Sequence, residues 1–459
     1  MTSPAADTAV VKALKKIRMP QTQRNREFWL LLFAVLISGA ALCLVQLGAL
    51  GTIDPTILTF GGGLAVLVFA LHIVLRIVAV QADPFVLPIA TLLTGLGIAM
   101  IYRIDIADEN IGWDAFSTKQ LAWTGISLAL AVVLIAALRN YRVLYRYTYL
   151  FGLAGIVLLL LPFIPGLGVE AGADVWVSLG GAISFQPGEL AKICLAIFFA
   201  GYLVRTRESL ASVGKKVLGI TWPRMRELGP VIVVWLVSLG IIVLQRDLGT
   251  GMLIFGMFIA MLYVATGKTS WVLIGIGGVA IGVFVAAQFL SYVQGRFTNW
   301  LYAFDPDVVD PQGPGFQLVQ GIFGLAHGGL FGTGLGQGYP DATPLAHSDY
   351  IIPSLGEELG ITGLFAILAL YMVFVSRGVR IGIAGQDDFG KLLATGLSFT
   401  LALQVFIMVG GVTRVIPLTG LTTPFLAAGG SSLVANWLIV GLLLRISDAV
   451  RRQPRVVIG

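Results

Sequence analysis

Apolar runs separated by short polar stretches follow one another along almost the whole chain, from residue 28 to residue 444. Such runs are typical of membrane-spanning helices, which need about 20 apolar residues to cross the hydrocarbon core. Several runs are shorter, so their ends must extend into flanking polar sequence. Because a helix satisfies its own backbone hydrogen bonds, the pattern predicts an all-α polytopic membrane protein. The twelve expected spans cover residues 28–49, 57–80, 85–102, 121–138, 149–164, 190–204, 230–244, 248–265, 271–290, 355–375, 392–410 and 433–444.

Three segments on one side of this predicted bundle carry the most informative sequence. Residues 166–189 are polar and glycine-rich, and residues 291–354 form the longest loop. Residues 413–432 are apolar, but two prolines and three glycines interrupt them, which a regular spanning helix does not tolerate. This third segment is expected to be re-entrant backbone buried against protein. A binding site on that face is therefore predicted.

The charges agree with a membrane protein and orient it. Only 12% of the residues are charged, against about 25% in an average soluble domain. Most of the 30 Lys and Arg fall on the side of the N-terminus, which predicts cytoplasmic termini by the positive-inside rule. The net charge of +6 is thus explained by loops beside anionic lipid, and nucleic acid is not an expected partner. The exceptions are Arg103, Lys119, Arg246, Arg296 and Arg414 on the opposite side, and Lys192 within a span.

The acidic side chains between residues 332 and 360 are the first candidates for catalytic groups. Asp349 lies one turn before a span, where partial desolvation would raise its pKa and suit it to act as a general base. A helix N-cap is an equally good interpretation of this position. Glu357 and Glu358 follow about two helical turns later, and could bind a divalent cation, tune Asp349, or form a buried pair with an arginine.

Two further motifs carry charges next to predicted spans. Glu189 and Lys192 share a helix face at i,i+3, either as a structural ion pair or as a ligand site in which Lys192 would suit a pyrophosphate. In LQRDLGT, Arg246 and Asp247 are expected to form a tight turn whose charges neutralise each other.

The glycines and histidines of the long loop complete the candidates. GGLFGTGLGQG (328–338), which contains Gln337, lacks the lysine of a nucleotide-binding loop, so its glycines are expected to permit close approach of backbone or of a bulky ligand. His347 is near enough in sequence to influence Asp349, whereas His72 is expected to be a packed, hydrogen-bonded residue within a span. The three histidines make no zinc pattern.

Five motifs together give the chain a family resemblance. FQPGELAK, LQRDLGT, GGLFGTGLGQG, HSDYIIPSLGEELG and PLTGLTTPFLAAGGSSLVANW stand in the order and spacing of the SEDS proteins, the group containing RodA and FtsW. The resemblance covers roughly residues 83–452. It implies a SEDS-type helical bundle with a ten-span core, so that residues 28–80 are an added pair of N-terminal spans. The expected organisation is a cytoplasmic tail (1–27), this pair (28–80), the glycosyltransferase core (81–452) and a short cytoplasmic tail (453–459).

The resemblance implies a peptidoglycan glycosyltransferase that polymerises lipid II at the outer face of the cytoplasmic membrane, together with a class B penicillin-binding protein. The family's essential aspartate falls on Asp349 and its acidic partner on Glu357. The glutamate of its QPSELAK-like motif falls on Glu189, and the aromatic residue before that motif on Trp176. HSDYII, FLAAGGSS and Arg246 differ from the commoner family forms. The resemblance therefore implies no contacts with the acceptor sugar at these positions.

The resulting hypothesis is an inverting glycosyl transfer with Asp349 as the base. Lys192, Glu189, Trp176, His347 and Gln337 are expected to bind substrate, and Asp349 with Glu357 to hold a Mg or Mn ion. The short C-terminal tail favours a RodA-like role in cell elongation and shape over an FtsW-like role in division. Two alternatives remain open: a flippase for lipid II, which many spans and buried charges would also suit, and a scaffold that recruits the transpeptidase.

Overall fold

The computed structural model describes residues 23–168, 175–179, 183–211, 216–217, 220–221, 229–309 and 315–452. Within these ranges the chain is a helical bundle, and each of the twelve expected spans overlaps a helix. Ten described helices are long and apolar enough to cross a membrane. The other two, at residues 148–163 and 229–244, contain 16 residues each and are shorter than a full crossing. The chain is therefore an integral membrane protein of the expected class.

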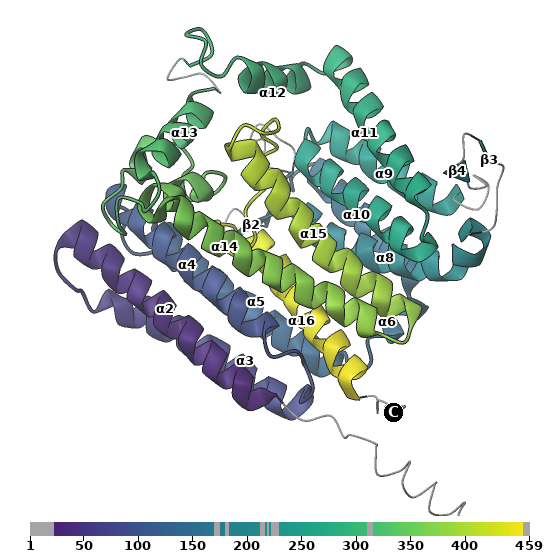
Figure 1. Ribbon diagram of the computed structural model, residues 1–459, viewed down its shortest axis with the longest axis horizontal. Helices are drawn as coiled ribbons and strands as arrows, with labels where there is room; N and C mark the ends of the chain where they lie inside the picture. Colours follow the sequence, from purple (N-terminus) through teal and green to yellow (C-terminus); the bar gives the residue numbers. More distant parts are fainter. Residues whose placement is uncertain are drawn as a thin grey trace, which may run out of the picture.

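Figure 1 shows the helices and the few short strands in their order along the chain. The N-terminal part contains α2 (Arg24–Leu50), η1 (Leu58–Gly62), α3 (Gly63–Val78), α4 (Val86–Ala107), α5 (Phe116–Ala137), α6 (Val143–Arg146), α7 (Thr148–Leu160), η2 (Leu161–Phe163), β1 (Val177–Leu179), β2 (Ile183–Phe185) and α8 (Pro187–Ala211). There follow β3 (Lys216–Val217), β4 (Ile220–Thr221), α9 (Gly229–Leu244), α10 (Leu248–Thr266), α11 (Thr269–Phe289), α12 (Ser291–Leu301), α13 (Phe316–Gly328), η4 (Pro340–Ala342), α14 (Ile351–Ala384), α15 (Asp388–Val412) and α16 (Gly430–Arg452). The strands form two short antiparallel hairpins, β1–β2 and β3–β4.

The centre of the bundle is formed by α4, α8 and α16, whose spans are mostly buried by protein. In contrast, only 6% of the apolar span of α11 is buried, as expected of a helix that faces lipid. The α2–α3 pair packs along one side of the bundle, with α2 against α4 and α3 against α5 (Figure 1). The long loop expected at residues 291–354 contains two helices, α12 and α13, that the apolar runs did not predict.

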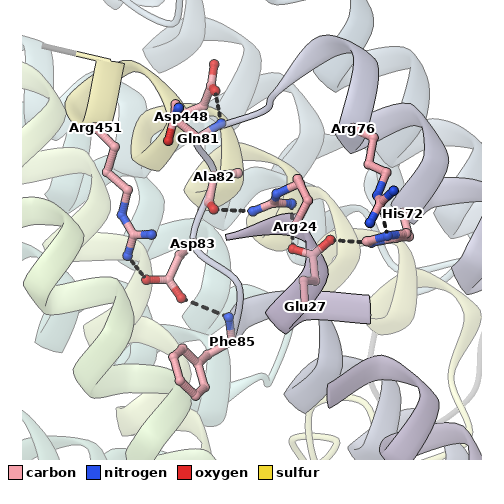
Figure 2. A network of polar contacts seen from close by, with 10 residues as sticks. All are labelled: Arg24, Glu27, His72, Arg76, Gln81, Ala82, Asp83, Phe85, Asp448 and Arg451. Atoms are coloured by element: carbon pink, nitrogen blue, oxygen red, sulfur yellow. Dashed lines mark hydrogen bonds and ion pairs between the residues drawn. The ribbon is translucent and has the colours of Figure 1, made fainter. Parts of the chain in front are cut away.

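The N-terminal pair is joined to the core through a buried polar network (Figure 2). Glu27 forms an ion pair with Arg24 at 2.6 Å and a hydrogen bond with His72 Nδ1 at 2.7 Å, and Arg24 donates a hydrogen bond to the carbonyl of Ala82. Arg76 Nε donates to His72 Nε2 at 3.1 Å, so His72 is the hydrogen-bonded residue that was expected. On the same network, Asp448 and Arg451 of α16 contact Gln81 and Asp83, so the beginning of α2 and the end of α16 lie at the same end of the bundle, which we call the termini end.

The segment 413–429 has no regular helix, and its central part is buried, as the prolines and glycines predicted. Side chains from the surrounding spans satisfy its backbone. Gln120 donates to the carbonyl of Ala427 at 3.0 Å, Gln404 to that of Thr422 at 2.8 Å, and Tyr371 to that of Pro424. Non-helical backbone is tolerated at membrane depth only where such partners exist. This segment lies at the opposite end of the bundle from the termini, which we call the loop end.

Candidate active site

Asp349 lies at the loop end, in the turn just before α14. The N-cap position of α14 is Tyr350, and no side chain caps this helix, so the N-cap interpretation of Asp349 is not realised. The Asp349 side chain is half-buried, and none of the hydrogen bonds or ion pairs given for the described residues involves it. A partly desolvated carboxylate without a structural partner is free to act on a substrate.

The surroundings of Asp349 hold its pKa near neutrality. Burial raises the pKa of Asp349 to about 6, Arg296 opposes this shift, and the negative charge of Asp247 adds to it. Arg296, on α12, donates a hydrogen bond to the carbonyl of Leu418 at 2.7 Å, and burial lowers the pKa of its own guanidinium. α12 and the turn before α10 thus bring one cation and a second carboxylate close to Asp349.

The expected tight turn is present, since the Arg246 amide donates to the carbonyl of Val243 at 3.2 Å, but the expected neutralisation of Arg246 by Asp247 is not seen among the described residues. Arg246 is exposed with a φ of 58°, and none of the ion pairs of the described residues joins the two side chains. Asp247 instead caps α10 by accepting a hydrogen bond from the Thr250 amide at 3.0 Å. Its carboxylate also accepts from Gln186 Nε2 at 3.4 Å, and burial raises its pKa. When Asp247 is ionised, its negative charge contributes to raising the pKa of Asp349.

Glu189 and Lys192 form the ion pair that their spacing allowed, with 2.6 Å between Glu189 Oε2 and Lys192 Nζ. Both side chains are buried, and Lys192 also donates to Gln404 Oε1 at 3.0 Å. Gln404 in turn holds the re-entrant segment, as described above. The ammonium of Lys192 is therefore engaged in packing α8 against α15, whereas the positive charge of Arg296 acts on the pKa of Asp349.

Glu357 and Glu358 belong to a different unit, built around a break in α14. Gly360 has a φ of 69°, which interrupts the helix, and a Cβ there would lie 2.3 Å from the amide nitrogen of Gly332. The amides of Ile361 and Thr362, freed by the break, donate to the carbonyls of Gly329 and Leu330 at 3.0 and 3.1 Å. The glycine-rich segment thus replaces the missing turn, and its glycines serve the approach of backbone to backbone.

The same segment pairs with the helix on the other side of the break. The amides of Thr333 and Gly334 donate to the carbonyls of Glu357 and Glu358, each at 3.0 Å. These bonds join the two motifs GGLFGTGLGQG and GEELG into one structural unit, which we call the α14 break. An interrupted helix within a membrane is stable only when its freed backbone groups find such partners.

Both glutamate side chains of the α14 break have partners in the protein. Glu358 pairs with Arg103 at 3.0 Å and accepts from the amides of Gly336 and Gly338 at 2.9 and 3.3 Å. This is the buried pair with an arginine that the sequence left open. Glu357 accepts from His327 Nδ1 at 2.9 Å and from the Tyr339 amide at 3.1 Å. No contact given for the described residues joins either glutamate to Asp349.

The expected metal site gains no support from this arrangement. Within the described residues there is no group of three or more His, Cys, Asp or Glu placed to hold a metal ion. Asp349 and Glu357 belong to separate clusters, so they do not form a ready pair of ligands. An ion bound by Asp349 would need its remaining ligands from elsewhere, for example from substrate phosphates, as is common for Mg²⁺. The Mg or Mn ion stays a prediction.

The remaining predicted residues are distributed around the loop end. His347 stacks on Phe116 with ring centroids 3.8 Å apart, and burial lowers its pKa. Trp176 is half-buried beside β1, without a described contact. Gln337 is exposed and donates to the carbonyl of Gly48 at 3.1 Å, which links the α14 break to α2. These three residues are therefore not brought into contact with Asp349 by any described bond.

Sequence reasoning missed the roles of Arg296 and Asp247 beside Asp349. Arg296 lies in a long loop without a motif around it, so only its position on the sparsely basic face could have singled it out. For Asp247, the signal was an aspartate three residues before Thr250 at the start of an apolar run, which is typical of an N-cap. That pattern argued against a charge-neutralising turn.

An apolar groove begins close to Asp247. A cavity of about 710 Å³ is lined by α10, α11 and α15, and a second one of about 150 Å³ continues it toward the loop end. The two share Met252, Phe255 and Val279, and the second includes Leu248, the neighbour of Asp247. A long hydrocarbon chain could lie in this groove with its polar end near the carboxylates.

Fold and site together define a polytopic helical membrane protein with a desolvated carboxylate at one end and an apolar groove beside it. The sequence model of the FtsW/RodA/SpoVE family, described as cell cycle proteins, matches residues 83–452. The chain belongs to this family. Like its mycobacterial relatives, the chain is a glycosyltransferase.

Three curated relatives show where this chain stands within the family. The peptidoglycan glycosyltransferase RodA of Mycobacterium tuberculosis is 44% identical over 438 residues, which cover 95% of this chain and 92% of the relative. RodA of Mycobacterium leprae is 42% identical, with the same shares covered. A probable FtsW of Geobacter sp. strain M18 is 34% identical over 80% of this chain and 97% of its own length. Of these three, only the two mycobacterial alignments are long enough to require most of the α2–α3 pair.

Solved structures show the same fold. A chain of a peptidoglycan synthase complex, described as coordinating polymerization and crosslinking, superimposes with a TM-score of 0.64 at 24% identity, covering 80% of this chain and 98% of that one. A mutant of the rod shape determining protein RodA of Thermus thermophilus gives a TM-score of 0.57 at 22% identity, covering 80% and 97%. These likenesses support the expected SEDS-type helical bundle.

Proposed function

We propose that this chain polymerises lipid II into β-1,4-linked glycan strands of peptidoglycan, with Asp349 as the catalytic base. The observation that carries this proposal is the half-buried Asp349 carboxylate, whose pKa is raised to about 6 and which no described bond occupies. Relatives of the chain that are 44% identical carry the name peptidoglycan glycosyltransferase RodA. Their alignment over 95% of this chain favours a role in cell elongation and shape.

The reaction is an inverting transfer between two lipid-linked sugars. Asp349 takes the proton from the 4-hydroxyl of an acceptor GlcNAc as that oxygen attacks C1 of the donor MurNAc. The bond from C1 to the undecaprenyl pyrophosphate breaks, and the pyrophosphate leaves with the electron pair. A glycosidase needs a second carboxyl group to protonate its leaving group, whereas pyrophosphate departs without one. A single base therefore suffices.

The pKa of Asp349 matches this role. A general base is most effective when its pKa lies near the working pH, because it is then both ionised and basic. With a pKa of about 6, the carboxylate is ionised at neutral pH and a stronger base than an exposed aspartate. The fixed positive charge of Arg296 keeps the pKa from rising further.

Arg296 is our candidate for offsetting the charge on the departing pyrophosphate. Its guanidinium is held in place by the carbonyl of Leu418 and lies near Asp349, where charge develops in the transition state. Lys192, the residue expected from the sequence, is already paired with Glu189 and Gln404. We assign no step to a metal ion, and Mg²⁺ brought by the pyrophosphate itself is compatible with this arrangement.

The proposed setting is the cytoplasmic membrane, with the loop end outward and both termini in the cytoplasm. The distribution of lysine and arginine supports this orientation. The groove along α10, α11 and α15 would hold one undecaprenyl chain, because its lining is almost wholly apolar. A class B penicillin-binding protein is the proposed partner, supported by the fold shared with a chain of a synthase complex that coordinates polymerization and crosslinking.

The proposal is tested by incubating the purified protein in detergent with lipid II, with and without the cognate transpeptidase and EDTA. Wild-type protein is expected to form glycan polymer, and Asp349→Asn protein to form almost none. Detergent micelles have no second leaflet, so a lipid flippase would give no polymer in either case. Normal polymerisation by Asp349→Asn would remove the assignment of the base.

A further inference from the structure

A polar cavity lies at the termini end of the bundle, far along α14 from Asp349. It has a volume of about 360 Å³ and is bounded by the final turns of α14 and α16 and by the connection between α3 and α4. Its polar lining consists of Asp83, Arg377, Arg380, Ser447 and Arg451, and the rest is apolar. We call it the arginine cavity. The glycosyl transfer proposed above makes no use of it.

The arginine cavity has an excess of positive charge. Asp83 is its single carboxylate and forms ion pairs with Arg377 at 3.3 Å and with Arg451, which Figure 2 shows next to it. The cavity lining therefore contains three guanidinium groups and one carboxylate. The neighbouring Asp448 does not compensate, because it pairs with Arg445 and Arg452 on its own helix.

Two donors of the arginine cavity have no protein acceptor among the described residues. The hydroxyl of Ser447 is buried and without a hydrogen-bond partner, although the side chain is only 1% exposed. Buried hydroxyl groups are almost always hydrogen-bonded, so Ser447 has a donor that remains unused among the described residues. The guanidinium of Arg380 is exposed, and no described hydrogen bond or ion pair involves it. Both groups would suit the oxygens of an anion.

We propose that the arginine cavity binds the phosphate of an anionic phospholipid headgroup such as phosphatidylglycerol. Arginine binds phosphate oxygens through two parallel hydrogen bonds, and Ser447 would supply a third. The cavity lies where two spanning helices end, which is the depth of lipid phosphates in a bilayer. Basic pockets between spanning helices on the cytoplasmic side are suited to anionic headgroups.

A free phosphate shares this chemistry but leaves the apolar lining unexplained. Ile381 and Val450 line the cavity beside the arginines, and acyl chains attached to a headgroup would extend over them.

Ordinary basic loop anchors also differ from this site. Arg146, for example, is exposed at the end of α6 without lining the cavity and without a described contact.

The test is native mass spectrometry of the full-length protein in detergent, titrated separately with phosphatidylglycerol, phosphatidylcholine and inorganic phosphate. The variants are Arg380→Gln and Ser447→Ala, with Arg146→Gln as the control that removes the same charge outside the cavity. Thermal unfolding without lipid checks that each variant is folded, and Arg380→Gln is expected to match wild type because its side chain has no described partner.

We expect wild-type protein to retain phosphatidylglycerol well above phosphatidylcholine. Loss of one charge-assisted hydrogen bond should weaken retention by about tenfold in Arg380→Gln, and by less in Ser447→Ala, with no change in Arg146→Gln. Equal retention of both lipids, or equal losses in Arg380→Gln and Arg146→Gln, would overturn the proposal. Binding of inorganic phosphate without preference for phosphatidylglycerol would contradict the lipid assignment. The readout does not depend on glycan polymerisation, so failure of one proposal leaves the other intact.

Discussion

Two acidic regions lie at the loop end within a few turns of each other along the chain, and they differ in their partners. Glu357 and Glu358, in the α14 break, accept hydrogen bonds from backbone amides and pair with His327 and Arg103. Asp349, directly before the same helix, has none of the described bonds. The carboxylates of the first region stabilise an interrupted helix, whereas the carboxylate of the second region can react with a substrate.

The comparison teaches that burial alone does not identify a catalytic acid in a membrane. A buried carboxylate that is fully paired stabilises the fold, and removing its partner leaves an uncompensated charge. A carboxylate that is desolvated without being paired can exchange a proton with a substrate. The following predictions separate the two cases, beginning with the largest expected effect.

Replacing Asp349 by Asn should abolish activity without destabilising the protein. We expect the polymerisation rate to fall by about 10²- to 10⁴-fold, the usual contribution of a general base. The thermal midpoint in detergent should stay within error of wild type, because no described bond is lost. If the variant instead unfolded at a lower temperature and lost activity in proportion, Asp349 would have a structural role like that of Glu357 and Glu358.

Replacing Arg296 by Gln should slow polymerisation by about 10²-fold, within the range seen when a single transition-state donor is removed. The substitution also removes the positive charge that holds down the pKa of Asp349. The pH at which activity is half-maximal should therefore rise. Initial rates at several pH values measure both effects, and a slowed enzyme with an unmoved pH midpoint would mean that Arg296 does not set the pKa of Asp349.

Replacing Glu358 by Gln should act on stability first. Breaking a buried ion pair costs about 3–5 kcal/mol, because Arg103 is left without a counter-charge. Thermal unfolding of the purified protein measures the loss. The double variant Arg103→Gln with Glu358→Gln removes both charges and should recover part of it. A single variant as stable as wild type would show that the α14 break does not need the pair.

Replacing Asp247 by Asn should produce the smallest effect. Asn also serves as a helix N-cap, so α10 keeps its capping bond. Loss of the nearby negative charge lowers the pKa of Asp349, and the pH for half-maximal activity should fall by less than about one unit. Activity below pH 6 would then rise by a few fold relative to wild type, measured in the same rate assay. A midpoint displaced upward would contradict the assigned charge coupling.

Much of the fold could be predicted from the sequence because hydrophobic length is a local signal. The apolar runs located the helices, and Pro417 and Pro424 marked the segment that is not helical. The pairing of the glycine-rich segment with α14 could not be predicted in the same way, since its backbone hydrogen bonds join residues 24 and 32 positions apart, such as 333 with 357 and 329 with 361. A composition rich in glycine indicates close approach without naming the neighbour.

The candidate site was predictable in its base and less so in its surroundings. Asp349 stood out as a carboxylate at the edge of a span and through the family motif around it. The choice between Lys192 and Arg296 as the relevant cation depended on which one was already paired, and pairing is decided by tertiary packing. The arginine cavity likewise combines residues from three separate parts of the chain.

The pH dependence of lipid II polymerisation by the wild-type protein tests the central claim most directly. Because Asp349 must be ionised to accept a proton, activity should rise with pH through a midpoint near 6 and then level off. The midpoint should move upward in Arg296→Gln and downward in Asp247→Asn. A rate that is flat from pH 4.5 to pH 8, or a midpoint unaffected by both substitutions, would contradict the assignment of Asp349 as the catalytic base.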